Sequence, residues 1–112
     1  MSDQLLLELA AKAAGIGPVL CYEARRRCLR IGNRSQYYLW RPLTTDGDAF
    51  RLSISSRMDV EQNRNSETEE SWVCASGFGH SAMEEFRSEG SRADATRRAI
   101  VRTAAKIGRS MP

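Results

Sequence analysis

Apolar residues at the start of the chain recur at helical spacing, at positions 5, 6, 9, 10 and 13. Ser2 and Asp3 precede them, and both are good N-cap residues because their side-chain oxygens accept hydrogen bonds from free backbone N–H groups. Gly15 is typical of a residue that ends a helix. The pattern therefore predicts a first helix between Asp3 and Gly15.

Short β-prone runs separated by turn residues follow, over 19–22, 27–31 and 37–40. We predict that they form a three-stranded antiparallel meander. In the middle run Arg27, Leu29 and Ile31 share one face, whereas Cys28 and Arg30 share the other. One side of this sheet should therefore be wetter than the other.

The stretch 49–58 fits two kinds of structure. Residues 50–55 alternate between apolar and polar as a strand does, but the side-chain oxygens of 44–48 are suited to capping a helix that begins at Ala49. We favour the helix. Beyond it the chain is polar apart from Val60, which predicts an exposed loop at about 61–71.

Two further segments precede the C-terminal part of the chain. Residues 72–75 are apolar and predict a buried strand. Residues 81–89 remain open, because Ser81 and Glu84 have the spacing of a helix capping box, yet the same segment also fits an edge strand.

The last element is predicted as a long amphipathic helix, and Ser91 with Asp94 again has capping-box spacing. One face carries Thr96, Ile100, Thr103, Ala104, Ile107 and Met111. The opposite face carries a basic stripe formed by Arg98, Arg102, Lys106 and Arg109. With the preceding elements this gives a single α+β domain over 1–112, in which the basic helix packs on the sheet.

The net charge of +3 hides an uneven distribution. Residues 1–45 carry seven Lys and Arg against three acids, residues 46–90 carry four against ten, and residues 91–112 carry six against one. The interpretation we favour is that the acidic middle folds against the basic ends. The alternative is a basic surface for an anionic partner.

The basic stripe extends for about 16 Å along the last helix, a spacing that could follow phosphate groups. It has no interleaved aromatic residues for stacking on bases, so sequence-specific nucleic-acid recognition is not indicated. An ordinary solvated helix face explains it equally simply.

A second set of binding candidates lies at the predicted hairpin tip, where Arg25, Arg26 and Arg27 are consecutive. An ordinary charged turn is the alternative interpretation. Tyr37 and Tyr38 should face opposite sides of their strand, so that one of them is exposed. An exposed Tyr38 near the basic turn would suit a binding hot spot.

Catalytic and metal-binding patterns are missing from the sequence. Cys21 and Cys28 are separated by six residues, and Cys74 and His80 by five, whereas zinc sites favour two to four residues between paired cysteines. His80 is the only histidine and lies in a glycine-rich turn that lacks the pattern of a phosphate loop. We therefore expect no metal, no cofactor and no enzymatic activity.

Location follows from similar reasoning. No apolar run reaches the roughly 20 residues that cross a bilayer, and the leucine-rich start follows Ser2 and Asp3 and not a basic segment. Three cysteines without an export signal are expected to be reduced thiols. We expect a cytoplasmic protein that does not bind membranes.

Stretches 6–15, 40–52 and 95–108 show a family resemblance. They read LLELAAKAAG, WRPLTTDGDAFRL and ATRRAIVRTAAKIG, and they resemble small phage and prophage proteins similar to the NinX-like group. Because the activity of that group is not established, no functional residues carry over. The resemblance implies a small phage accessory protein, a class that commonly binds and inhibits host machinery, including defence systems such as CRISPR.

The leading hypothesis is therefore a non-enzymatic phage accessory protein that binds a host protein or nucleoprotein complex through its basic faces. Two alternatives stay open. One is a nucleic-acid-binding module that uses the basic stripe, and the other is a binder of a small ligand or nucleotide signal with arginines around a sheet-lined pocket.

Overall fold

A computed structural model describes residues 1–63 and 71–112 of the chain. The N-terminal part contains α1 (Asp3–Ala14), β1 (Val19–Glu23), β2 (Cys28–Gly32) and β3 (Tyr37–Trp40). The remainder contains α2 (Asp46–Ser55), β4 (Asp59–Gln62), β5 (Ser71–Gly77), β6 (His80–Phe86), the short 3₁₀ turn η1 (Glu89–Ser91) and α3 (Arg92–Ser110). The predicted α+β class and the order of its elements are confirmed.

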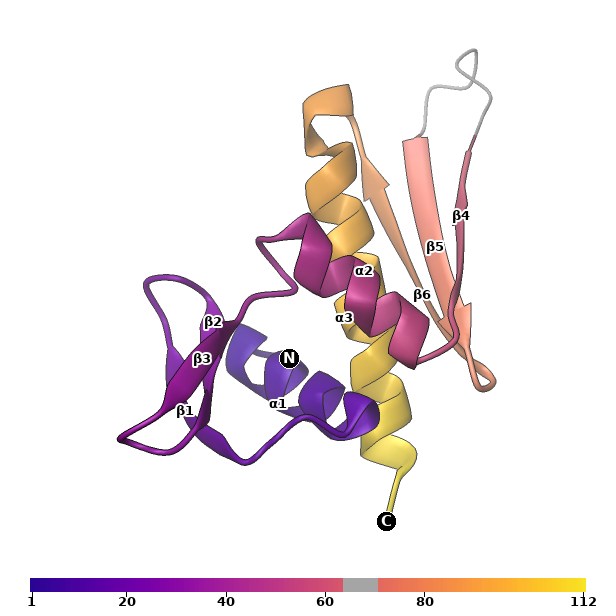
Figure 1. The fold of residues 1–112 in the computed structure, drawn as a ribbon. Helices are drawn as coiled ribbons and strands as arrows, with labels where there is room; N and C mark the ends of the chain where they lie inside the picture. Colours follow the sequence, from indigo (N-terminus) through magenta and orange to yellow (C-terminus); the bar gives the residue numbers. More distant parts are fainter. Residues whose placement is uncertain (64–70) are drawn as a thin grey trace.

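The strands form two separate antiparallel sheets, which we call sheet A (β1-β2-β3) and sheet B (β4-β5-β6). Figure 1 shows them at opposite ends of the molecule with the helices between them. The apolar side of sheet A packs on α1 through Leu29, Ile31 and Trp40, and the apolar side of sheet B packs on α3 through Val73 and Ala75.

The long helix α3 is the central element, since α1, α2, β5 and β6 all pack against it. Small side chains make this close packing possible, and Ala99, Ala104 and Ala105 are buried on different sides of the helix. At Gly108 the α1 backbone comes so near that an added Cβ would overlap the Leu9 carbonyl oxygen and lie 2.8 Å from the Leu9 carbonyl carbon. The two helices can therefore cross only over glycine.

A buried hydrogen bond ties α3 to sheet B. The hydroxyl of Thr103, which is fully buried, donates to the Ala75 carbonyl at 2.9 Å. This bond satisfies a polar group that would otherwise be costly to bury.

The favoured helix at 49–58 is confirmed in kind, although α2 begins three residues earlier, at Asp46, and ends at Ser55. The predicted capping by side-chain oxygens was wrong, because the N-cap residue Thr45 makes no side-chain cap hydrogen bond. The Asp48 carboxylate instead accepts the Arg41 backbone N–H at 2.7 Å and so connects the end of β3 to the helix.

The exposed loop predicted at about 61–71 begins later than expected, so the predicted start was wrong. Residues 59–62 form β4, which pairs with β5 so that Val60 lies opposite Ala75. Sheet pairing is non-local and does not appear in the local polarity of the segment. The rest of the predicted loop, residues 64–70, lies outside the described residues.

The open segment 81–89 is a strand for most of its length, so the capping-box interpretation of Ser81 and Glu84 was wrong. The capping box predicted at Ser91 was also wrong. The Ser91 side chain makes no cap hydrogen bond, because η1 leads directly into α3. The described ranges contain no helix of the length and apolar character needed to cross a bilayer.

The crossing of α1 over α3 gives a direct test of this packing. Replacing Gly108 by Ala forces a methyl group into the Leu9 carbonyl, and overpacking of this kind costs about 1–3 kcal/mol. Urea unfolding should show the lower stability. Gly90→Ala is the control, because its added Cβ meets only the Ser88 hydroxyl oxygen at 3.5 Å. Equal unfolding midpoints for the two variants would contradict the packing described.

Candidate functional site

The basic stripe of α3 is not an open surface. Arg98 lies 3.3 Å from Asp3 of α1 and 3.4 Å from Glu84 of β6, and Arg102 lies 3.2 Å from the same Glu84 carboxylate. The side chains of both arginines are only 35% exposed. Both arginines are therefore partly enclosed, because β6 and the start of α1 pack along either side of the stripe.

The other two stripe residues differ from each other. Lys106 donates to the Ser81 carbonyl of β6 and lines, with Arg98 and Arg102, a recess of about 410 Å³. Arg109 is exposed near the C-terminal end of α3 and makes no ion pair within the described residues. The structure thus brings three of the four predicted cations together, and leaves Arg109 apart.

A chain of ion pairs runs through this seam. Arg27 contacts Asp3 at 3.0 Å, and Asp3, Arg98, Glu84 and Arg102 follow in sequence. It joins sheet A, α1, α3 and β6. Glu84, from the acidic middle of the chain, thus pairs with two arginines of the basic last helix.

The predicted cluster of Arg25, Arg26 and Arg27 is divided by the turn between β1 and β2. Arg27, with a positive φ of 49°, directs its side chain to Asp3. Arg26 pairs with Glu23, whereas Arg25 is exposed and has no ion-pair partner in the part of the chain that the structure describes. Only Arg25 and Arg26 therefore remain on the exposed side of the turn.

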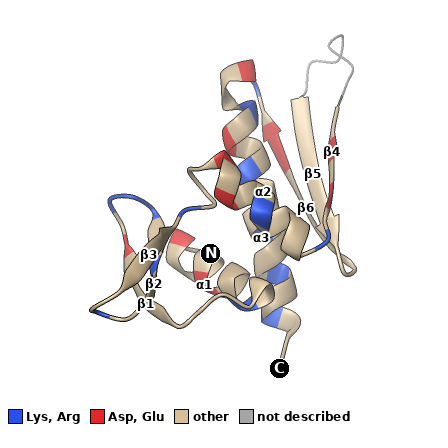
Figure 2. Ribbon diagram, viewed as in Figure 1, with Lys and Arg blue, Asp and Glu red and all other residues tan. Residues whose placement is uncertain are grey.

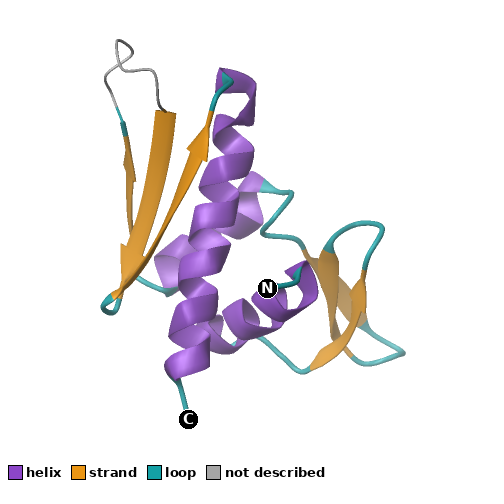
Figure 3. Ribbon diagram, turned by 180° about the vertical axis from the view of Figure 1, so that it is seen from behind, coloured by secondary structure: helices purple, strands orange, loops and turns teal. Residues whose placement is uncertain are grey.

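The side of sheet A that faces away from α1 is more informative than the stripe. Strand alternation and register place Cys21, Glu23, Cys28, Arg30, Tyr37 and Leu39 on this outer side. Figures 1 and 3 show no helix or second sheet over it.

Glu23 organises the centre of this outer side. It accepts hydrogen bonds from Arg26 and, at 3.0 Å, from Arg30. The bond from Arg26 is the main cause that lowers the pKa of Glu23, and burial opposes it in part. The same bonds raise the pKa of both arginines. The guanidinium carbon of Arg30 also lies 5.1 Å from the centroid of the Tyr37 ring, a cation–π contact.

Further arginines extend the positive charge to both ends of the sheet. Residues 19–41 contain six arginines and one acidic residue, Glu23. With Arg27 directed to Asp3, five remain on the outer side and its turns, and we call them the arginine face: Arg25, Arg26, Arg30, Arg34 and Arg41. Figure 2 shows basic positions at both ends of sheet A.

Sequence reasoning missed most of this surface. Arg30, Arg34, Arg41 and Tyr37 were not among the predicted binding residues, although the ratio of six arginines to one acid was a visible signal. Charge periodicity is visible along a single helix, whereas the arginines of sheet A come together only through the pairing of three strands.

The two tyrosines do face opposite sides, as predicted, because Tyr38 pairs with Ile31 on the side of α1. The expectation that only one is exposed was wrong: Tyr37 is 45% and Tyr38 56% exposed. β3 is an edge strand, and α1 packs chiefly on β2.

Comparisons of the chain with protein-family models, with curated proteins and with solved structures found no match. The resemblance to NinX-like phage proteins therefore stays a prediction. Within residues 1–63 and 71–112, no group of three His, Cys, Asp or Glu side chains is placed to hold a metal ion.

The two cysteines on the outer side of sheet A differ in burial, and this difference can be tested. Cys28 is fully buried, and burial raises the pKa of its thiol, whereas Cys21 is exposed. Because the thiolate is the reactive form, Ellman's reagent should modify Cys21 quickly and Cys28 only after unfolding. Cys21→Ser should remove the fast phase. Loss of that phase in Cys28→Ser would contradict the burial of Cys28.

Proposed function

We propose that this chain is a non-enzymatic phage accessory protein that binds an anionic surface of a host macromolecule through the arginine face. The observation that carries the proposal is the concentration of five arginines against one glutamate on the outer side of sheet A and its adjoining turns, which no other described element covers. Such an excess of one charge favours partners of the opposite charge and speeds their association.

The chemistry of the face supports binding to carboxylates or phosphates. Every cation in it is an arginine, whose planar guanidinium group binds both kinds of oxygen anion in a bidentate manner. Arg and Tyr are also enriched among the residues that dominate interface energies. Because Glu23 and Tyr37 already hold Arg30 in place, less side-chain entropy is lost when a partner binds.

Binding without catalysis is proposed because of where His80 lies. A general base needs a nearby group that orients it, and His80 has no hydrogen bond to a carboxylate among the residues described. It also lies at the start of β6, on the other sheet from the arginine face. The family resemblance supplies the phage context and the inhibitory role in the proposal.

The decisive comparison is between two charge-reversed variants of equal net charge. Arg34→Glu/Arg41→Glu changes the arginine face, whereas Arg87→Glu/Arg109→Glu changes exposed arginines elsewhere. Each protein is used to capture partners from nuclease-treated host lysate, followed by quantitative mass spectrometry. The first variant should lose partners that wild type and the second variant retain. Identical capture by all three proteins would refute the proposal.

Nucleic-acid binding is a second candidate function, and the exposed Tyr37 ring beside Arg30 favours it, since bases stack on aromatic side chains. It would use sheet A and not the basic stripe, whose arginines are engaged by Glu84 and Asp3. Titration of a labelled single-stranded oligonucleotide should then show affinity that falls steeply with salt. Tyr37→Ala should weaken binding by about tenfold. Partner capture that disappears on nuclease treatment would favour this candidate over the first.

A further inference from the structure

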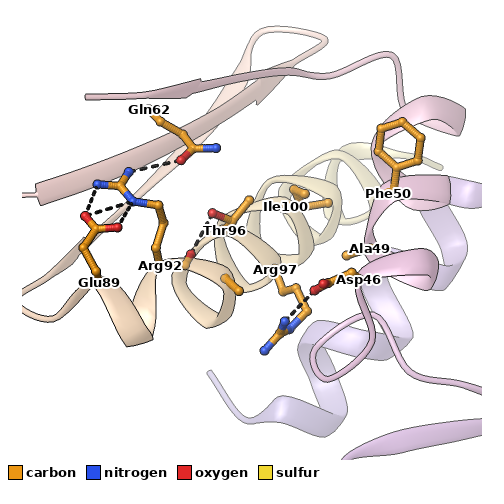
Figure 4. Close-up of a pocket in the computed structure, with 10 residues that line it drawn as sticks. Asp46, Ala49, Phe50, Gln62, Glu89, Arg92, Thr96, Arg97 and Ile100 are labelled. Atoms are coloured by element: carbon orange, nitrogen blue, oxygen red, sulfur yellow. Dashed lines mark hydrogen bonds and ion pairs between the residues drawn. The ribbon is translucent and has the colours of Figure 1, made fainter. Parts of the chain in front are cut away.

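A groove of about 580 Å³ lies between α2, the first half of α3 and β4, and none of the five residues of the arginine face lines it. Its lining consists of Asp46, Ala49, Phe50, Gln62, Glu89, Arg92, Ala93, Thr96, Arg97 and Ile100. Figure 4 shows Phe50 and Ala49 on the α2 side, Gln62 on the strand side, and Thr96 and Ile100 on α3 between them.

Apolar side chains are left uncovered in and beside this groove. Phe50 is 66% exposed, Ile54 one turn further along α2 is 59% exposed, and Val60 of β4 is 37% exposed. Large exposed apolar patches mark interaction sites, whereas single exposed apolar residues are common. The groove therefore suits large apolar side chains of a partner.

The charged residues of the groove are already satisfied. Arg92 contacts Glu89 at 2.8 Å and donates to Gln62 at 3.1 Å, and Arg97 contacts Asp46 at 2.6 Å. They leave little net charge for a small anionic ligand to bind, so the groove favours an apolar occupant.

The free edge of β4 indicates that a partner bound in the groove would be an extended segment. This strand is at the edge of sheet B, all four of its residues are exposed, and no described strand pairs with its outer edge. Neighbouring strands are about 4.8 Å apart and packed helices about 8–10 Å apart, so one helix covers roughly two strands. Since α3 covers β5 and β6 and the groove separates α2 from β4, a strand added next to β4 would lie against the groove.

The side of β4 that faces away from the helices indicates that the bound segment would carry basic residues. Val60 and Gln62 face the helices, so Asp59 and Glu61 face away from them. Both carboxylates are exposed, and neither has an ion pair with any residue in 1–63 or 71–112. A strand beside them would gain most from basic side chains at the matching positions.

We propose that the β4 edge and the groove bind an extended segment of a partner protein in which large apolar residues alternate with Lys or Arg. The apolar residues would enter the groove against Phe50 and Ile100, and the basic residues would lie beside Asp59 and Glu61. Such strand addition takes its affinity from main-chain hydrogen bonds and its specificity from alternate side chains. This site goes beyond the binding proposed for the arginine face and does not depend on it.

The test uses two short labelled peptides, one alternating Val with Lys and the other alternating Val with Glu. Fluorescence anisotropy should show that the wild-type protein prefers the Lys peptide by about tenfold or more. Asp59→Lys/Glu61→Lys should invert this preference, whereas the control Glu85→Lys, on β6, should leave it unchanged. Phe50→Ser should weaken binding of the preferred peptide, and because Phe50 is exposed this variant is expected to fold.

Several results would overturn the proposal: no binding of the Lys peptide near millimolar concentration, no inversion in the Asp59/Glu61 variant, or unchanged binding by Phe50→Ser. A wild-type dimer that Phe50→Ser converts to a monomer in light scattering would assign the groove to a second copy of the chain instead. Arg34→Glu/Arg41→Glu should bind the peptide as wild type does, so failure at this site and failure at the arginine face can be told apart.

Discussion

The close packing of α3 on all sides is the constraint on which the rest of the structure depends. The helix can be contacted by α1, α2 and two strands of sheet B only because its contact positions are small, with Gly108 where α1 crosses and alanines elsewhere. Thr103 adds one buried hydrogen bond to Ala75. A helix of this kind is a central support for two sheets that do not pair with each other, and each sheet keeps one uncovered side.

That packing also decides which charged side chains form ion pairs within the fold and which stay exposed. β6 lies on one side of the basic stripe and the start of α1 on the other. Arg98 therefore pairs with Asp3 and Glu84, and Arg102 pairs with Glu84. The arginines of sheet A have one carboxylate, Glu23, among them, and it orients two of them without cancelling the rest. The same sequence feature, a run of cations, thus forms ion pairs within the fold in α3 and stays exposed on sheet A, where we propose that it binds a partner.

Much of the fold could be predicted from the sequence because its signals are local. The first helix, the meander and the long last helix were found from periodicity, capping residues and turns. The identities of β4 and β6 could not be decided locally, since both depend on pairing with β5. The stripe was misjudged because a helical pattern shows which residues share a face but not which elements pack against it. The arginine face required strand register, which pairs Arg30 with Cys21 and Leu39 on one side of the sheet.

Arg98 and Arg102 are therefore expected to stabilise the fold, whereas the arginine face is proposed to bind a partner. Measuring the thermal stability of variants distinguishes the two sets most directly. Thermal unfolding should be measured for Arg98→Glu/Arg102→Glu and for Arg34→Glu/Arg41→Glu, which carry the same change of net charge. The first variant places two acids against Glu84 and Asp3 and should melt clearly below wild type, whereas the second should melt close to it. Equal melting temperatures for the two variants, or a larger loss in the second, would contradict the claim.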